Sequence, residues 1–375
     1  MTSAALPGGQ APSTRRSVTL EVRQGVSSLR QALAIAGGLG VGLGISVAIL
    51  VSAGVDLPGL WQEFVVYTLF RPRGLASTLV EATPLVLVGL SAAIAFRVRF
   101  WNIGIEGQFL FGAMGAALIA LYDVGPEATR LPLMLLAALA GGALWTVLPL
   151  VLKLRLSVNE IISTLLLNYV AGLFLLDLLY GAWQDPVNRF PHTPQFGAAE
   201  RLPPIGFETV SAGLVVALVA AALVAFLALR SRIGLYMTVT GSNPEMARAV
   251  GIPVVAVTAV AVFLAGALSG LAGFVVAAGT EYRLTTSIAG GYLFSGIVVA
   301  FLARNNPVAA IVVAFLLGAL YVGGQSLQVF YNLSAGVIEL LQAIVVLSVA
   351  GSEFFVRYRI VRHGGAAPGA GRAPA

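Results

Sequence analysis

The chain has 375 residues, of which 58% are hydrophobic and only 10% are charged. A soluble domain is about half apolar and about a quarter charged, so we predict a polytopic, all-α membrane protein. The sequence has no cysteine and only two histidines, His192 and His363, which excludes disulfides, thiolate metal sites and a histidine metal cluster. We expect no metal and no cofactor. The net charge of +6 lies in short patches between apolar runs, so nucleic-acid binding is not expected.

Residues 1–30 are rich in Pro, Gly, Ser, Thr and Arg and are predicted to form a disordered cytoplasmic tail. A transmembrane domain is predicted over 31–353. A signal peptide is the alternative for its first apolar segment, but a length above ~20 residues and the late position favour a retained anchor. Residues 54–75 are amphipathic and are expected to form an interfacial helix. Ten transmembrane helices are predicted, near 31–53, 76–96, 105–122, 131–151, 157–181, 209–229, 254–277, 288–303, 307–325 and 336–351.

The positive charges indicate the orientation of these helices. With ten helices and a cytoplasmic N-terminus, sixteen Lys and Arg lie on the inner side and six on the outer side. This bias agrees with the positive-inside rule, so both termini are predicted to be cytoplasmic. Residues 182–208 are then an extracellular loop, in which five prolines favour irregular structure. Residues 230–253 form a cytoplasmic loop, and 354–375 form a basic and Gly/Ala/Pro-rich cytoplasmic tail.

Two segments combine glycine with aromatic residues, 97–115 and 290–296. In the predicted topology, helices two to five run oppositely to helices seven to ten. The two segments are then counterparts in an inverted repeat, an arrangement that builds substrate sites from interrupted helices. The alternative is that glycine is merely frequent, since the chain has 43.

Polar residues within the apolar segments are the candidates for a substrate path. Asn102, Glu106 and Gln108 lie in the first glycine/aromatic segment. A charge at mid-membrane costs about 2.5–3.5 kcal/mol, so such groups usually face the protein interior or a water-filled path. Glu160 and Asn168 are eight residues apart and therefore share a helix face.

A structural role is the alternative for Glu160. It lies near the inner end of its helix, where Lys153 or Arg155 is available as an ion-pair partner.

The cytoplasmic loop contains the signals of a short helix. Asn243 is a capping residue, Pro244 suits the first helical position, and Glu245 complements the positive helix end. Gly251 and Pro253 then end the helix. A helix under two turns is marginal in water and needs a partner surface. That surface belongs either to the chain's own helix bundle or to a docked cytoplasmic protein.

The sequence has no catalytic constellation, so no enzymatic activity is expected. The only lysine, Lys153, is followed by Leu154 and has no upstream glycine-rich loop, which excludes an ATP-binding P-loop. No G-x-S-x-G or HExxH motif is present. If ATP drives this protein, another chain must bind it.

Four stretches in order carry a family resemblance: 100–113, 158–171, 241–252 and 291–307. With the pattern of apolar segments over about 30–355, the chain resembles the permease subunits of bacterial ABC importers for sugars, branched-chain amino acids and nucleosides, and most of all the nucleoside branch. The resemblance implies an importer in the bacterial cytoplasmic membrane. It also implies a cytoplasmic ATP-binding subunit, a second permease subunit in a homo- or heterodimer, and an extracellular solute-binding lipoprotein.

The expected function is transport of nucleosides or a related sugar-containing solute through a lipid-embedded path. The alternatives are a sugar or branched-chain amino acid permease, or a proton-coupled secondary transporter that uses Glu106 or Glu160. The expected path residues are Asn102, Glu106, Gln108, Phe109, Glu160, Asn168, Tyr292, Phe294 and Ser295. The aromatic ones can stack on the solute, and lipid-facing packing is the alternative for at least half of the aromatic candidates. The resemblance assigns coupling to the ATP-binding subunit to Asn243, Pro244, Ala247, Arg248 and Gly251.

Overall fold

The structure is a computed structural model that describes residues 17–22 and 27–363. The chain divides into two compact units: a helical unit, Leu50–Gln342, and a terminal unit made of residues up to Ile49 and from Ala343 onward. The α-helices are α1 (Ser28–Ser52), α2 (Leu57–Leu60), α3 (Pro72–Arg97), α4 (Ile105–Leu121), α5 (Glu127–Trp145), α6 (Val147–Leu156), α7 (Glu160–Tyr180), α8 (Gly213–Arg230), α9 (Arg232–Ser242), α10 (Pro244–Ala249), α11 (Val254–Val276), α12 (Tyr292–Leu302), α13 (Pro307–Tyr331) and α14 (Ala335–Arg357). The remaining elements are the π-helices η1 (Trp61–Phe70) and η3 (Ala277–Glu281), the 3₁₀-helix η2 (Ala198–Glu200), and the strands β1 (Ser17–Val22) and β2 (Tyr358–His363).

Each of the ten predicted apolar segments coincides with helix in the structure. Within the described residues, seven helical segments are long and apolar enough to cross a membrane, and Ile105–Leu121, Tyr292–Leu302 and Gly336–Ser352 are shorter apolar helices. The helical, membrane-embedded fold class is therefore confirmed. The number of crossings and the side on which the termini lie stay predictions.

The terminal unit contains a strand pair that the sequence analysis does not anticipate. β1 and β2 pair antiparallel, with Ser17 opposite His363 and Val22 opposite Tyr358. Residues 17–22 thus depart from the predicted disordered tail, because both strands are rich in β-branched residues that favour extended backbone. Residues 1–16 and 364–375 of the predicted tails lie outside the described residues.

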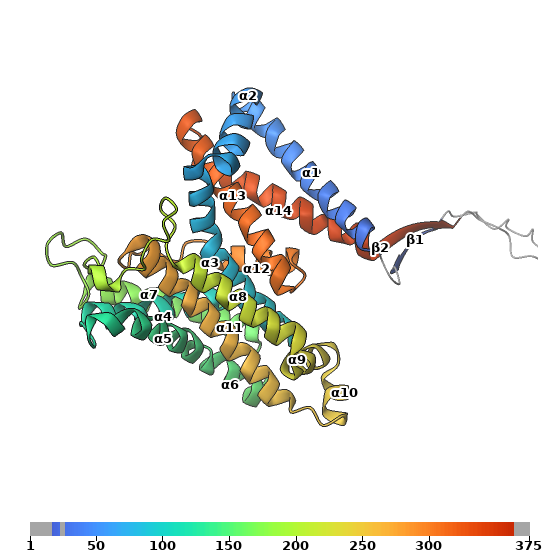
Figure 1. Cartoon of the computed structure of the whole chain (residues 1–375). Coiled ribbons are helices and arrows are strands. Elements are labelled where there is room, and N and C mark those ends of the chain that lie inside the picture. The colour runs from blue at the N-terminus through green and yellow to red at the C-terminus, as the bar shows by residue number, and fades with distance from the viewer. Residues whose placement is uncertain (1–16, 23–26, 364–375) are drawn as a thin grey trace, which may run out of the picture. The chain divides into compact units, whose positions relative to one another are not determined.

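In the helical unit, α11 packs against α3, α4 and α5 (Figure 1). A glycine seam, formed by Gly112 of α4, Gly142 of α5, and Gly266 and Gly270 of α11, lets these helices approach backbone to backbone. A Cβ atom added at Gly112 would overlap the backbone of Gly270, and one added at Gly142 would overlap the Gly266 carbonyl. Small residues at such contacts are what membrane helices use to pack closely.

Residues 54–75 form two helices and the start of a third, where the sequence analysis expects one interfacial helix. The Asp56 carboxylate caps α2 by accepting a hydrogen bond from the Gly59 N–H at 2.9 Å. η1 follows and packs on α13 and α3, and Arg71 adopts extended backbone before Pro72 starts α3. The helical character is confirmed, and the location at a membrane surface stays a prediction.

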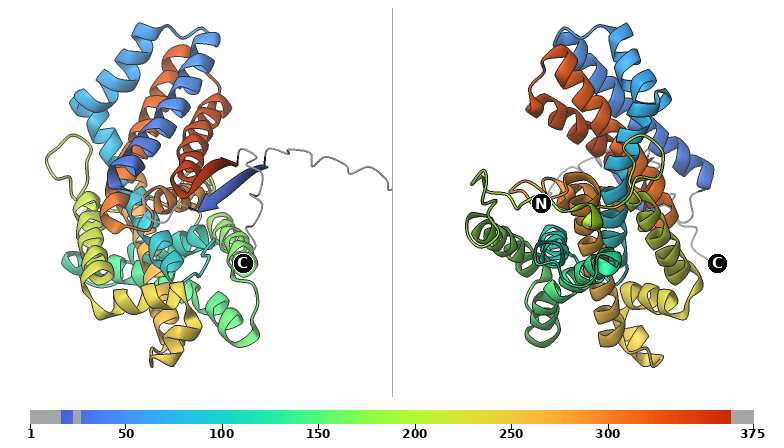
Figure 2. Two further views of the ribbon diagram at one scale, coloured as in Figure 1. Left: turned by 90° about the vertical axis from the view of Figure 1, so that its right-hand side faces the viewer. Right: turned by 60° about the vertical axis from the view of Figure 1, so that its left-hand side comes forward.

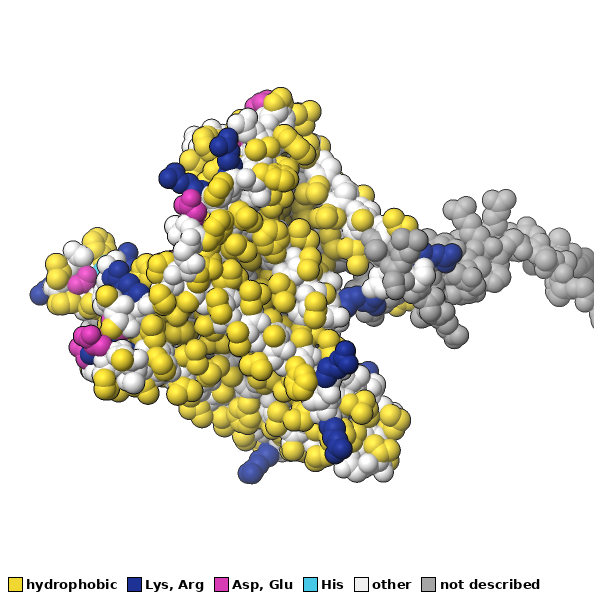
Figure 3. Space-filling model, viewed as in Figure 1, with side chains coloured by type: hydrophobic (Ala, Val, Ile, Leu, Met, Phe, Trp, Pro, Cys, Tyr) yellow, Lys and Arg dark blue, Asp and Glu magenta, His cyan; other side chains and the backbone are white. Residues whose placement is uncertain are grey.

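The two ends of the helical unit carry different sets of charged side chains. The two further views show α9 and α10 beyond the ends of α8 and α11 (Figure 2). On the face drawn in Figure 3, hydrophobic side chains cover the sides of these helices. Lys and Arg stand out near α9 and α10, whereas Asp and Glu appear together with further Lys and Arg near the opposite end. An apolar belt between charged ends is the surface expected of helices embedded in lipid.

Candidate translocation path and coupling segment

The segment between α3 and α4 is a turn held together by side-chain amides. Asn102 and Gln108 donate to each other through their amide groups, each at 2.9 Å, and the Asn102 Oδ1 also accepts from the Gly104 N–H at 3.1 Å. The two side chains are 0% and 1% exposed. Their hydrogen-bonding groups thus engage each other and the start of α4, which shapes the turn by which the chain enters that helix.

α7 holds the same turn from the side. The Asn168 Oδ1 accepts from the Gly107 N–H at 2.8 Å, and its Nδ2 donates to the Ile103 carbonyl at 2.7 Å. The Thr164 hydroxyl accepts from the Ile103 N–H at 3.2 Å. The first N–H groups of a helix have no partner within the helix. Asparagine suits this position because its amide both donates and accepts.

Glu160 begins α7 and forms an ion pair with Lys153, whose Nζ lies 2.6 Å from the Glu160 Oε2. The Glu160 side chain is 8% exposed and that of Lys153 is 41% exposed. This pairing is the structural alternative considered for Glu160, and it joins the end of α6 to the start of α7. Asn159 caps α7 next to it, accepting from the Ile161 N–H at 2.8 Å.

The two glycine/aromatic segments meet where α4 passes α12. Phe109 is fully buried and stacks on Tyr292, with ring centroids 5.1 Å apart and an interplanar angle of 24°. Glu106 lies one turn earlier on α4 and is half-buried, and its carboxylate has no hydrogen-bond or ion-pair partner among the described residues. A carboxylate and two aromatic rings thus lie on neighbouring turns of these helices.

The other predicted path residues of α12 have different surroundings. The buried Ser295 hydroxyl donates to the Gly291 carbonyl at 2.9 Å and accepts from the Tyr321 hydroxyl of α13 at 2.6 Å. Phe294 is 72% exposed on the outside of the helical unit. The structure therefore groups Ser295 with Tyr292 but not with Phe294.

Three residues near Tyr292 are absent from the sequence-based site. Glu81 of α3 lies within electrostatic range of Tyr292, Tyr321 and Glu281, the last residue of η3. Glu81 is an acidic residue inside an apolar run, the same signal that marked Glu106, and that signal was available in the sequence. No sequence signal marked Tyr321, because a tyrosine in an apolar helix is usually a packing residue.

The coupling segment has the predicted local structure. The Asn243 Oδ1 accepts from the N–H groups of Glu245 and Met246, each at 3.0 Å, and Pro244 takes the first position of α10. Gly251 has a φ of +82°, the left-handed conformation that ends a helix. Its N–H donates to the Arg248 carbonyl at 3.0 Å.

The two remaining coupling candidates, which are consecutive in α10, differ in burial. Ala247 is buried against the chain itself, whereas Arg248 is exposed.

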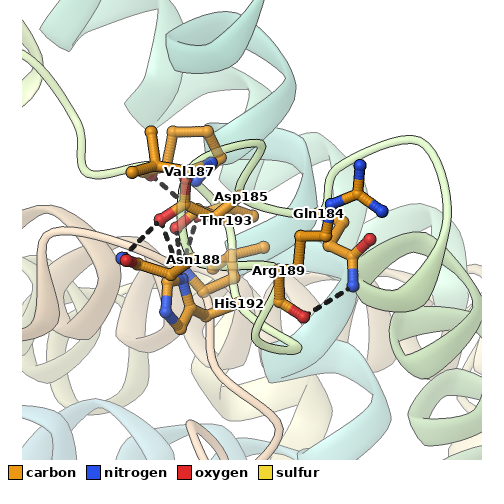
Figure 4. A network of polar contacts seen from close by, with 9 residues as sticks. Gln184, Asp185, Val187, Asn188, Arg189, His192 and Thr193 are labelled. Atoms are coloured by element: carbon orange, nitrogen blue, oxygen red, sulfur yellow. Dashed lines mark hydrogen bonds and ion pairs between the residues drawn. The ribbon is translucent and has the colours of Figure 1, made fainter.

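The loop between α7 and α8 is irregular, as predicted, and is held by a polar network (Figure 4). The Asp185 carboxylate accepts from the Val187 N–H at 2.9 Å and from the Asn188 amide at 3.2 Å. The Thr193 N–H donates to the Leu284 carbonyl at 3.0 Å, and the Leu284 N–H returns a bond to the Thr193 hydroxyl at 3.0 Å. The loop is therefore fastened to the segment that leads from η3 to α12.

Over residues 17–22 and 27–363, no group of three or more His, Asp or Glu is placed to hold a metal ion.

Comparison with known proteins decides the family. The family model described as branched-chain amino acid transport system / permease component matches residues 74–349. The chain belongs to this family. It is therefore the permease subunit of an ABC transporter, a multi-pass membrane protein. The glucose ABC transporter permease protein of Haloferax volcanii is 36% identical, over 83% of this chain and 85% of the relative.

Two further relatives of this permease have nucleoside names. The guanosine ABC transporter permease protein of Bacillus subtilis is 31% identical, over 75% of this chain and 82% of the relative. A nucleoside ABC transporter permease protein of Lactococcus lactis is 26% identical, over 70% of this chain and 75% of the relative.

Proposed function

We propose that this permease forms the translocation path of an ATP-driven importer for nucleosides or a related sugar-containing solute, in the cytoplasmic membrane of a bacterium. The observation that carries the proposal is the chemistry shared by its relatives, which are named for glucose, guanosine and nucleosides. A sugar ring is common to all three. Recognition of that ring requires hydrogen-bonding groups and a flat apolar surface inside a chain that is otherwise hydrophobic.

The path lies where α3, α4, α12 and α13 come together. Glu81 and Glu106 supply carboxylates that accept hydrogen bonds from sugar hydroxyls, and Tyr292 supplies a ring on which a sugar or base stacks. The arrangement of these side chains supports the proposal, because acidic groups in apolar helices are costly unless they serve such a path. The start of α4 is held beside this path by the side-chain amides of Asn102, Gln108 and Asn168.

The predicted inverted repeat remains part of the proposal, with α3, α4, α5 and α7 as counterparts of α11, α12, α13 and α14. Under that symmetry, packing of α3 on α13 is matched by packing of α11 on α5, and packing of α3 on α12 by that of α11 on α4. All four packings are present, and α3 also packs on α11. These pairings support a two-fold axis that passes between α3 and α11.

The partners follow from the two ends of the helical unit. α10 is proposed to dock the ATP-binding subunit, with Asn243 and Gly251 fixing its ends, Pro244 its first turn, Ala247 its inner face, and Arg248 exposed to the partner. A helix of six residues is unstable alone and fits a role in which both its caps and a partner hold it. A second permease subunit completes the path, and an extracellular binding lipoprotein delivers the solute.

Uptake of labelled guanosine into cells or proteoliposomes that contain the whole transporter tests this function. We expect uptake that requires ATP and an active ATP-binding subunit, and that unlabelled nucleosides reduce more than amino acids do. Uptake that continues without the ATP-binding subunit and stops when the proton gradient is dissipated would refute the proposal in favour of a proton-coupled transporter. Competition by glucose but not by nucleosides would move the substrate to the simple sugars.

The path residues are tested within the same assay. Glu81→Gln and Glu106→Gln keep the side-chain size, but each replaces one of the two acceptor oxygens of a carboxylate by an NH₂ donor. We therefore expect a raised KM for the solute. Glu127→Gln, at the exposed start of α5, is the matched control and should leave uptake unchanged. Normal KM values in both path variants would remove these carboxylates from solute recognition.

A further inference from the structure

Arg97, the last residue of α3, connects three parts of the helical unit. Its Nη1 donates to the Ala228 carbonyl at 2.7 Å, and its Nη2 donates to the Asn305 carbonyl at 3.4 Å. Ala228 lies in the last turn of α8, and Asn305 lies in the turn between α12 and α13. One guanidinium therefore joins the ends of α3, α8 and α12.

The acceptors are groups that need a partner. The last four carbonyls of a helix have no donor within the helix, and a cation at that end interacts favourably with the helix dipole. Ala228 offers such a carbonyl. Asn305 has a φ of +56°, a left-handed conformation in a tight turn, and its own N–H is already used on the Ala300 carbonyl at 2.8 Å.

α9, the helix that precedes α10, packs against the end of α3 at Arg97. Gly241 of α9 lies so close to the Arg97 carbonyl that an added Cβ atom would overlap it. The corner between α8 and α9 is fixed by Ser231, whose hydroxyl accepts from the Gly234 N–H at 3.1 Å and donates to the Leu227 carbonyl at 2.5 Å. A displacement of α10 and α9 is thus passed to the end of α3 and to its arginine.

We propose that Arg97 is the positioning residue that transmits movement of the coupling segment to α12, which carries Tyr292 and Ser295. The inference rests on the proposed function, in which α10 docks the ATP-binding subunit. Arginine suits the task because its planar group holds donors in a fixed fork, so it bonds two carbonyls of different elements at once. Lysine has no such fork and fixes the geometry of two acceptors less well.

Neighbouring Arg99 provides a matched control. It is exposed in the turn after α3, with a φ of +55°, and its guanidinium makes no hydrogen bond or ion pair with the described residues. The two arginines lie at the same end of α3 and carry the same charge. A loss of positive charge alone should therefore affect both positions equally.

Distances between spin labels measure the transmission in the complete transporter, because the natural chain has no cysteine and labels can be placed without background. A reference label at Leu136 of α5 is paired with one at Leu235 of α9, and separately with one at Phe294 of α12, all three being exposed. In the otherwise unchanged chain, ATP should shift both distances. In Arg97→Gln we expect the α9 shift to persist and the α12 shift to disappear, and Arg99→Gln should keep both.

Transport per ATP hydrolysed gives the second readout. Arg97→Gln removes two hydrogen bonds from a charged donor, so it should lower uptake by about tenfold or more while ATP hydrolysis continues. Arg97→Lys should give an intermediate loss, and it carries the test if the glutamine variant does not reach the membrane.

The outcomes separate the inference from the proposed function. Both shifts retained in Arg97→Gln, or wild-type coupling in Arg97→Lys, would overturn the role of Arg97 and leave the proposed function standing. No ATP-dependent shift at Leu235 in the unchanged transporter would overturn docking through α10, and the inference with it.

Discussion

Gly270→Ala is the most direct test of the packing between α11 and its neighbours. An added Cβ atom would lie 3.0 Å from the Gly142 Cα and 3.1 Å from its nitrogen, and would overlap the Ala138 carbonyl oxygen. Carbon atoms prefer separations of about 3.5–4.0 Å, so α11 and α5 must move apart by about 0.5–1 Å. All three contacted atoms belong to the backbone and have no rotamer by which to give way.

The expected cost follows from two opposing effects. Overpacking costs about 1–3 kcal/mol, and the upper end applies because backbone must move. Replacing glycine by alanine in a helix returns about 1 kcal/mol. We therefore expect Gly270→Ala to lower the free energy of unfolding by about 2 kcal/mol.

The assay is the unfolding midpoint of purified protein in detergent, by heat and by denaturant. Gly172→Ala in α7 is the matched control, since an added Cβ atom meets nothing within 4 Å there and the helix propensity gain stands alone. Gly270→Ala should unfold earlier than the unchanged chain, and Gly172→Ala at the same point or later. Equal or greater stability of Gly270→Ala would refute the close backbone approach.

Three further predictions concern polar contacts. Asn168→Ala leaves two backbone groups near α4 without partners at about 1–3 kcal/mol each, so we expect a loss of about 2–6 kcal/mol in the same unfolding assay. Asn243→Ala removes the cap of α10 at a local cost of about 1 kcal/mol; hydrogen exchange of α10 should rise and stimulated ATP hydrolysis should fall, while unchanged exchange would contradict the capping role. Lys153→Met strands the buried Glu160 carboxylate, so it should destabilise more than Glu160→Gln, and the double variant should recover part of the loss; additive losses would show that the two residues do not act as a pair.

The helices were predictable because burial in lipid imposes long apolar segments on the sequence. The caps of α10 were equally predictable, since Asn243, Pro244 and Gly251 act through their own backbone and nearest neighbours. A helix cap depends on a few consecutive residues, so it can be predicted without knowing the rest of the fold.

Contacts between distant residues were beyond the sequence. Asn168 was expected to act with Glu160 because they share a helix face, yet its amide bonds the backbone of Ile103 and Gly107, more than 60 residues away. The pairing of β1 with β2 joins segments more than 300 residues apart, and neither strand's sequence indicates which segment it pairs with. Glu81 differs, because an acidic residue in an apolar run is visible without a structure.

The fastening of the loop before α8 has a mechanical consequence for α12. Thr193 and Leu284 fix the segment that leads to this helix, and the carbonyl of Asn305 is fixed beyond its other end. Because α12 is held near both ends, it cannot move far along its axis, but it can rotate about that axis. Gly290 and Gly291, the latter with a φ of +87°, lie between the fastened segment and α12 and form a natural pivot. A rotation of α12 about its own axis would expose or withdraw the face that carries Tyr292 and Ser295 without displacing the helix.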